Sequence, residues 1–408
     1  MKVLIVSQSP THISHGGAEV AAENLAVSLA SEGVSVEIAT AVPHSYSNTK
    51  VSIADNHLPL KRHLIPSEAV HPFFINEDPA SVRNWLKTAE EANADVIHFH
   101  HFFRIGTNVL NQINNLDLSS ISLLTLHEYL AICLRDGQLV RTSGAQCSDR
   151  SPLDCLKCNH NSLNDGGLVY VQSRNEIFKN LLMSMDHLIA PSNFLMHQFV
   201  NWGINPLRIS QIPNVINDPN TPPKSSRKAK KRILFVSSLT KVKGLETFIA
   251  AAEDILSRTD APLDVNFEIW GTTLPAGMDS KFHEILDLRS NNIKLMGNFE
   301  RAALDDVLSS STLVVCPSLW FENRPTILDE AAIRGIPTLS SNIGGMKEIA
   351  DRTNSWTFKV GDSFDLAESI LELLSSEPPI NSSPLDFLDA KDRHIDLYRK
   401  IIDSKIDH

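Results

Sequence analysis

The stretch that decides the fold is 312–351, which reads TLVVCPSLWFENRPTILDEAAIRGIPTLSSNIGGMKEIAD. It opens at 312–317 with a short apolar, β-branched run, typical of a parallel strand that is buried on both faces. We expect a helix next, because Pro325 suits the first helical position. A second strand, 337–341, then leads into paired glycines and another helix. Two strand–turn–helix units in succession predict a parallel α/β sheet.

Two carboxylates and two glycines follow the predicted strand ends. Glu322 lies on the loop before the first helix and Glu330 lies within that helix, with seven residues between them. Helix N-termini present unpaired N–H groups to an anion, and glycines such as Gly344 and Gly345 let the backbone come close. The pattern therefore indicates an edge that binds phosphate and sugar hydroxyls. Two isolated glutamates are more often a helix-capping residue and a solvated loop charge, so the surrounding sequence must decide.

The surrounding sequence resembles glycosyltransferase family 4, a family of retaining enzymes whose GT-B fold has two facing Rossmann-like domains. The resemblance lies in FENRPTILDEA at 321–331, which matches the E-x7-E signature, and in the SNIGGMKEI that follows. It implies that Glu322 contacts the transferred sugar and that Glu330 contacts the ribose of the nucleotide. It also implies donor binding by Asn323 and diphosphate binding by the amides of Gly344 and Gly345.

Composition limits the class of protein. With 408 residues and 42% hydrophobic content, the chain can bury two ordinary cores. The formal net charge of −11 argues against a nucleic-acid partner. The N-terminus lacks the long apolar core of a signal peptide, and no run approaches the length of a membrane span. We expect a cytoplasmic protein that can also touch the inner face of the cytoplasmic membrane.

Strand and helix patterns alternate in both halves of the chain. Apolar strands are expected at 34–41, 95–100 and 123–127 in the first half, and the alternation restarts at 232. This order predicts two doubly wound, Rossmann-like α/β domains. We assign 1–216 to an acceptor domain, 217–231 to a polar linker, 232–384 to a donor domain, and 385–408 to a last helix that packs back on the acceptor domain.

The first half contains a second set of candidate residues. Gly16 and Gly17 follow the first strand, although a Gly-Gly helix entrance alone is more often a tight turn than a ligand loop. The resemblance implies that they border the acceptor and the donor diphosphate. It also places a functional histidine at His127, next to the donor sugar, although a lone strand-end histidine is more often structural. We expect His100 and His101 to form the floor or the acceptor side.

The second half of the chain contains a candidate phosphate-binding lysine near its start. Lys243 in TKVKG at 240–244 matches the family's phosphate-binding lysine. Ser237 and Ser238 stand where the family has Gly and Arg, so one cationic contact is missing unless Lys241 supplies it. A lysine just before a helix N-terminus suits a leaving diphosphate.

Four of the five cysteines fall in the segment 133–160, which leaves the helix–strand alternation. A segment of this length is unusual as ordered structure unless a cross-link holds it. Cytoplasmic conditions disfavour disulfides as that cross-link. We therefore predict a structural zinc ion bound by the four thiols, with partly buried thiols as the alternative. The proposed ligands are Cys133, Cys147, Cys155 and Cys158.

The sequence thus predicts a retaining glycosyltransferase with Glu322 and His127 as its catalytic residues. It would move a sugar from a nucleotide-sugar donor to a glycan or lipid-linked acceptor, without a catalytic metal, in the synthesis of cell-surface polysaccharide or glycolipid. One alternative is an epimerase or hydrolase of nucleotide sugars on the same fold. Another is a non-catalytic protein that binds nucleotide sugars.

Overall fold

The computed structural model shows two compact units. It describes residues 1–14, 16–46, 60–70, 73–116, 118–159, 167–216, 231–258, 264–271, 292–298, 303–309, 311–353, 355–375 and 387–406. The first unit is Met1–Asn217 together with Phe387–His408, and the second unit is Asp218–Asp386. Each unit is described below by itself.

The first unit is built on a parallel sheet of seven strands within the described ranges. Their order is β3-β2-β1-β4-β5-β6-β7, and all the pairings are parallel. Between β1 and β4 the strand order reverses, which is the topological switch point where open α/β sheets place their ligands. The strands are β1 (Lys2–Ser7), β2 (Ser35–Val42), β3 (Lys61–Pro66), β4 (Val96–Phe99), β5 (Ile121–Thr125), β6 (His187–Ala190) and β7 (Ile209–Gln211).

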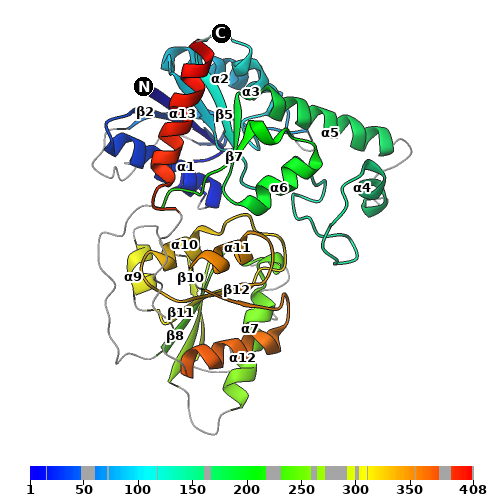
Figure 1. Cartoon of the computed structure of the whole chain (residues 1–408), viewed down its shortest axis with the longest axis vertical. Helices are drawn as coiled ribbons and strands as arrows, with labels where there is room; N and C mark the ends of the chain where they lie inside the picture. Colours follow the sequence, from blue (N-terminus) through cyan, green and yellow to red (C-terminus); the bar gives the residue numbers. More distant parts are fainter. Residues whose placement is uncertain are drawn as a thin grey trace. The chain divides into compact units, whose positions relative to one another are not determined.

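The last helix of the chain belongs to the first unit. Figure 1 shows α13 (Ala390–Ile406) beside α1 (Gly17–Ser31). Ala390, Ile395 and Tyr398 of α13 are buried in one cluster with residues of β1 and α1. This helix therefore completes a core that the first 217 residues begin. The other helices are α2 (Pro79–Ala92), α3 (Thr107–Asn114), α4 (Pro152–Cys158), α5 (Gly167–Ser184), α6 (Asn193–Trp202) and the 3-10 turn η1 (Pro206–Arg208).

The second unit repeats the architecture with six strands among its described residues. Their order is β10-β9-β8-β11-β12-β13, again all parallel. The strands are β8 (Lys231–Val236), β9 (Val265–Trp270), β10 (Ile293–Gly297), β11 (Leu313–Cys316), β12 (Thr338–Ser341) and β13 (Trp356–Phe358). The helices are η2 (Lys241–Lys243), α7 (Leu245–Ser257), α9 (Leu304–Ser309), α10 (Thr326–Ala332), α11 (Gly344–Thr353) and α12 (Ser363–Ser375).

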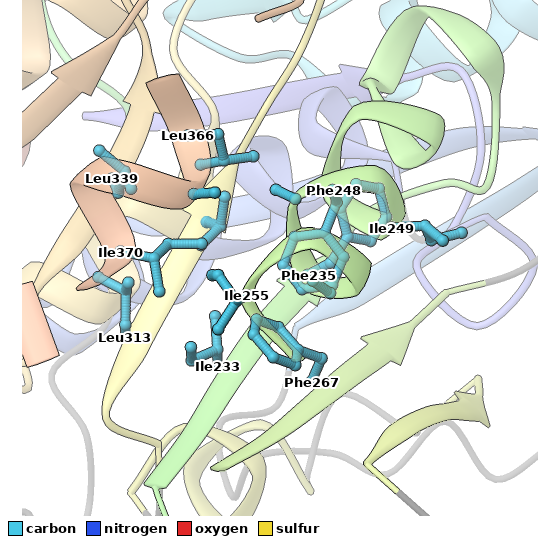
Figure 2. Close-up of a cluster of buried hydrophobic side chains, with 14 of the residues drawn as sticks. Ile233, Phe235, Phe248, Ile249, Ile255, Phe267, Leu313, Leu339, Leu366 and Ile370 are labelled. Carbon is cyan, nitrogen blue, oxygen red and sulfur yellow. The ribbon is translucent and has the colours of Figure 1, made fainter. Parts of the chain in front are cut away.

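Alternation along β8 supplies apolar side chains to both faces of the second sheet. Ile233 and Phe235 enter one buried cluster, whereas Leu234 between them enters another on the opposite face. Figure 2 shows Phe235 packed with Phe248 of α7 and Phe267 of β9. The centroids of the Phe235 and Phe248 rings are 5.6 Å apart. Both faces are therefore covered, as the apolar strand runs predict.

The predicted doubly wound α/β fold is confirmed in both units. Residues 217–230 of the predicted linker lie outside the described residues. None of the helices in the described ranges is long and apolar enough to cross a membrane. One local expectation was wrong, because Pro325 occupies the N-cap position and α10 begins at Thr326.

The packing of α13 gives a stability prediction. Tyr398 is fully buried and its hydroxyl bonds to His98, so Tyr398→Ala leaves a cavity and an unpaired ring nitrogen. We expect a loss of about 3–5 kcal/mol in the free energy of unfolding of the first unit. Urea denaturation measures it, with the exposed neighbour Arg399→Ala as a control expected within about 0.5 kcal/mol of wild type. A loss below about 1 kcal/mol for Tyr398→Ala would show that α13 is not part of this core.

Candidate functional site

Three loops of the second unit meet at one edge of its sheet. Strands β8, β11 and β12 are neighbours and run parallel, so their carboxyl ends share that edge. The loops 237–244, 317–325 and 342–343 follow these strands. They carry or adjoin all the candidate residues that the sequence assigned to donor binding in this half.

Gly244 lets the first loop press against the second. It has a φ of +76°, and a Cβ atom there would lie 1.8 Å from the carbonyl oxygen of Pro317. The amide of Leu319 donates a hydrogen bond to the carbonyl of Val242 at 2.8 Å. A residue other than glycine would therefore separate the loops, and Lys243 would leave its place.

Gly345 lets the start of α11, which follows the third loop, approach the backbone of the second loop. A Cβ atom at Gly345 would lie 1.5 Å from the carbonyl oxygen of Asn323. The Gly345 amide donates to the carbonyl of Glu322 at 3.0 Å. This bond engages an amide that the sequence assigned to the diphosphate, so in this structure Gly345 fixes the backbone of Glu322. Gly344 begins α11 with a φ of +56°.

One carboxylate oxygen of Glu322 accepts three hydrogen bonds. The donors to Oε1 are Nζ of Lys243 at 2.5 Å, Nε1 of Trp320 at 2.6 Å and Oγ of Ser318 at 2.8 Å. The Lys243 ammonium also lies 4.9 Å from the centroid of the Trp320 ring. Sequence reasoning missed Ser318 and Trp320; their only signal was their position in the loop between the strand end and Glu322.

These partners keep Glu322 ionised. Burial alone would raise the pKa of its carboxyl group, but the Lys243 charge and the three hydrogen bonds together lower that pKa below 4.5. The nearby Cys316 thiol stays neutral, because burial and the Glu322 charge raise its pKa to about 12. This edge of the sheet therefore holds the negative charge of Glu322 beside the positive charge of Lys243. The carboxylate can accept hydrogen bonds from sugar hydroxyls, and the ammonium can bind a diphosphate.

A buried ion pair fixes the start of α10, which carries Glu330. Nε of Arg324 lies 2.6 Å from Oδ2 of Asp329, and NH2 of Arg324 lies 2.9 Å from Oδ1. Both side chains are almost completely buried. Glu330 itself is 2% exposed, and its backbone carbonyl accepts from Arg334 at 2.6 Å. Its carboxylate is thus placed by a rigid element, as a recognition residue requires.

The glycine loop of the first unit lies beside the side chain of Glu19. Gly16 is the N-cap of α1, and a Cβ atom there would lie 2.4 Å from Oε2 of Glu19. Gln8 donates to the other oxygen of Glu19 at 3.1 Å. At Gly17 a Cβ atom would meet nothing within 4 Å. The contact at Gly16 is with the end of a flexible side chain, so packing requires a glycine at neither position. His15, which precedes them, lies outside the described residues.

A connected group of histidines links His127 to the last helix. Nε2 of His127 and Nδ1 of His100 are 3.1 Å apart, and the two rings stack. The His100 ring lies 4.5 Å from that of His98. Nδ1 of His98 is 2.6 Å from the Tyr398 hydroxyl, and its Nε2 is 2.7 Å from Oγ1 of Thr125. Two of the predicted strand-end histidines, His127 and His100, therefore join a group that reaches Tyr398 through a ring contact with His98.

The network favours one tautomer of His127. Burial lowers the pKa of His127 to about 3 and that of His100 well below 6.5, so both rings are neutral. Nε2 of His100 is buried without a hydrogen-bond partner. A buried, unpaired N–H is rarer than an unpaired acceptor, so the His100 proton belongs on Nδ1, where it is donated to His127. His127 then carries its own proton on Nδ1 and is a hydrogen-bond donor there.

Glu128 is a further polar residue beside His127 that sequence reasoning did not select. Nδ1 of His101 accepts from the amides of Phe102 and Phe103 at 3.0 and 2.9 Å, so its proton lies on Nε2. That nitrogen is 3.4 Å from Oε1 of Glu128. Burial raises the pKa of Glu128 to about 8, which keeps the carboxyl group largely protonated at neutral pH. Its adjacency to His127 was the signal that could have found it.

The predicted zinc site finds no support. Cys133, Cys147, Cys155 and Cys158 are free thiols. In the described ranges, no group of three or more His, Cys, Asp or Glu side chains is arranged to hold a metal ion. Burial raises the pKa of the Cys155 thiol to about 12, and the three other cysteines of the set reinforce this shift.

The described part of the cysteine segment has ordered structure of its own. Val140 and Gln146 form an antiparallel bridge around a turn, and the Ser151 side chain caps α4. Arg174 of α5 is buried and donates to the backbone carbonyls of Leu130 and Ala131 just before the segment. These hydrogen bonds contribute to the order of the segment.

Two protein-family models match the chain. The model described as Glycosyltransferase Family 4 matches residues 15–218, and the model described as Glycosyl transferases group 1 matches residues 230–376. A curated relative is the Phosphatidylinositol N-acetylglucosaminyltransferase gpi3 subunit of Schizosaccharomyces pombe, 26% identical over 220 residues. That match covers 53% of this chain and 45% of the relative, so the chain aligns with less than half of that protein.

Solved structures show the same fold at low sequence identity. Anabaena Alr3699/HepE in complex with UDP has a TM-score of 0.67 and 17% identity, with both chains covered completely. Sucrose-phosphate synthase from Thermosynechococcus elongatus has a TM-score of 0.66 and 16% identity, over 98% of this chain and 96% of that one. The fold and the family matches agree: the chain belongs to glycosyltransferase family 4 and has the GT-B fold.

Proposed function

We propose that the protein transfers a sugar from a nucleotide-sugar donor to a hydroxyl group of a glycan or lipid-linked acceptor, with retention of the anomeric configuration. The observation that carries this proposal is the ionised Glu322 carboxylate, held by Lys243, Trp320 and Ser318 where three strand–helix loops meet. A nucleotide sugar needs hydrogen-bond acceptors for its hydroxyls and positive charge for its diphosphate. This edge supplies both.

Lys243 is the proposed diphosphate ligand. A lysine ammonium has three N–H donors, and one of them goes to Glu322. The other two can donate to phosphate oxygens without breaking the ion pair. Positive charge at this point stabilises the negative charge that develops on the leaving diphosphate. Because Ser238 replaces the family's arginine, we assign the side-chain phosphate contacts to Lys243 and Lys241.

The two glutamates divide the donor between them. As the family resemblance implies, Glu322 accepts hydrogen bonds from the hydroxyl groups of the sugar. Glu330 accepts hydrogen bonds from the hydroxyl groups of the ribose. A carboxylate that is already fixed in place needs no reorganisation when the sugar develops positive charge at its anomeric carbon. The placement of Glu322 by two close glycine contacts supports this role.

The proposed transfer occurs on one face of the sugar. The bond from the anomeric carbon to the phosphate oxygen breaks, and a bond to the acceptor oxygen forms on the same side. The acceptor proton goes to the leaving diphosphate, so no protein base is required. His127 is the second proposed catalytic residue, as the family resemblance implies. These steps balance atoms and charge within the two substrates.

The relatives suggest the first donors to test. Anabaena Alr3699/HepE was solved with UDP-glucose, and the Schizosaccharomyces pombe subunit is named for N-acetylglucosamine transfer. Radiolabelled UDP-glucose and UDP-N-acetylglucosamine should therefore be incubated with lipid and polysaccharide extracts. Label in a glycan or glycolipid product supports the proposal. Release of free sugar or an epimer alone would instead favour a hydrolase or an epimerase.

The division of roles predicts different effects for the two glutamates. Glu322→Gln should lower transfer by about 100-fold or more while the Kd for the free nucleoside diphosphate stays within about twofold. Glu330→Gln should weaken nucleotide binding by about tenfold. Glu372→Gln, an exposed substitution on α12, is the matched control. Equal loss of nucleotide affinity in both site variants, measured by calorimetry, would show that the roles are assigned wrongly.

The ion pair also predicts a pH dependence of stability. The folded-state pKa of Glu322 is lowered, so its contribution is present above about pH 4.5 and is lost as the pH falls through the folded pKa. Lys243→Met should therefore cost about 2 kcal/mol of unfolding free energy at pH 7 and less at acid pH. Lys241→Met, at an exposed position, is the control.

The comparison is made by urea denaturation between pH 3 and pH 8. In a Glu322→Gln background the Lys243→Met effect should be small at every pH, because the charge that Lys243 pairs with is absent. A Lys243→Met effect that is independent of pH in the wild-type background would mean that the lysine stabilises the unit through something other than Glu322.

A further inference from the structure

Three buried histidine rings connect the sheet of the first unit to its last helix. His98 lies in β4, His100 follows that strand, and His394 lies in α13. These residues are 0%, 2% and 3% exposed. The centroid of the His98 ring is 4.5 Å from that of His100 and 5.9 Å from that of His394. The helix is therefore packed on the sheet through titratable rings as well as through apolar side chains.

Hydrogen bonds fix how α13 meets these rings. The Tyr398 hydroxyl is 2.6 Å from Nδ1 of His98, and the Tyr398 ring lies 6.2 Å from that of His394. Nδ1 of His394 is 2.7 Å from the carbonyl oxygen of Ala390. A carbonyl can only accept, so the proton of neutral His394 lies on Nδ1. A second proton would occupy Nε2.

The surroundings of the three rings oppose a second proton. Burial is the main cause: it lowers the pKa of His394 to about 4, although the bond to Ala390 acts in the opposite direction, and those of His98 and His100 well below 6.5. Neighbouring histidines lower the pKa values of His98 and His100 further, and the Arg393 charge lowers that of His394. Two protonated rings at the distances given above would repel each other strongly in a buried site.

Further titratable groups act on His100. Burial lowers the pKa values of His127 and His101 to about 3, so both are neutral. Glu128 lies 3.4 Å from His101, and its pKa of about 8 keeps it largely protonated at neutral pH. These neighbours therefore supply little negative charge to balance a protonated ring.

Ion pairs hold α13 near both of its ends. Lys391 pairs with Glu32, which follows α1, and Nζ of Lys405 is 3.6 Å from Oδ2 of Asp186. His394 and Tyr398 lie between these pairs. Histidine is the side chain whose ordinary pKa lies between pH 5.5 and pH 7.5. The contacts of α13 that respond to mild acid are therefore those between its ends.

We propose that mild acid releases α13 from the first unit, because protonation of the buried histidines places like charges between the helix and the sheet. The folded-state pKa values lie below the ordinary value of 6.5, so an open form takes up protons more readily than the closed form. The closed form keeps its full stability above pH 6.5 and loses it as the pH falls toward the folded-state values. An effect on catalysis, through the group that reaches His127, rests on the proposed function, whereas release of the helix does not.

His394 alone sets the size of the expected effect. With a folded-state pKa of about 4 and an ordinary value of 6.5, a change from pH 7.5 to pH 5.5 should favour the open form about tenfold. Protonation of His98 and His100 in the open form increases this factor.

Hydrogen–deuterium exchange of the full chain at pH 7.5 and pH 5.5, corrected for the intrinsic exchange rates, tests the proposal. Protection of α13 should fall tenfold or more at pH 5.5 and recover at pH 7.5, while that of α2 and α6 stays within twofold. In His394→Gln the fall should be about tenfold smaller, because that side chain cannot take up a proton. His197→Gln, an exposed substitution on α6, is the matched control and should behave as wild type does.

The proposal is overturned if protection of α13 in the wild-type protein changes less than twofold between the two pH values. It is also overturned if His394→Gln folds and shows the wild-type fall, or if α2 and α6 lose protection together with α13, which is unfolding of the whole unit. The wild-type result decides the question even where His394→Gln does not fold. None of these measurements involves a donor or an acceptor, so a protein that transfers no sugar would refute the transferase proposal and leave this one standing.

Discussion

The ion pair between Lys243 and Glu322 joins two loops at the candidate site of the second unit, and its geometry depends on two glycines, Gly244 and Gly345. Gly244 lets the loop that carries Lys243 touch the backbone of Pro317, and Gly345 lets α11 touch that of Asn323. Each contact excludes a Cβ atom, so the positions of both charges are set by backbone packing. The Lys243 charge and the hydrogen bonds that this packing places around Glu322 outweigh burial and keep the carboxylate ionised.

In the first unit, a chain of ring contacts and hydrogen bonds plays the corresponding structural part. It runs from His127 through His100 and His98 to Tyr398 of the last helix. Because burial keeps these rings neutral, the network can fix which nitrogen of His127 holds the proton. The last helix therefore contributes to the first unit in two ways, by covering its core and by anchoring the polar network beneath a candidate catalytic histidine.

The sequence was sufficient for the fold and for the placement of Glu322 and Lys243 at one edge, because apolar strand runs and strand-end loops leave local patterns. It could not show that the Gly345 amide would bond to Glu322, nor that Tyr398 would meet His98 across 300 residues, because these contacts arise only in tertiary packing. The zinc prediction finds no support among the described residues. Cysteine spacing carries no information about the hydrogen bonds that order the same segment.

The central claim is that a nucleotide sugar binds at the edge formed by the loops of the second unit around Lys243 and Glu322. Hydrogen–deuterium exchange with and without saturating nucleotide, UDP or UDP-glucose first, tests it most directly. The account predicts slower exchange in 237–245 and 317–330, with helix α6 of the first unit unchanged. A nucleotide that binds by independent titration but leaves exchange in both of these segments unaltered would contradict the account.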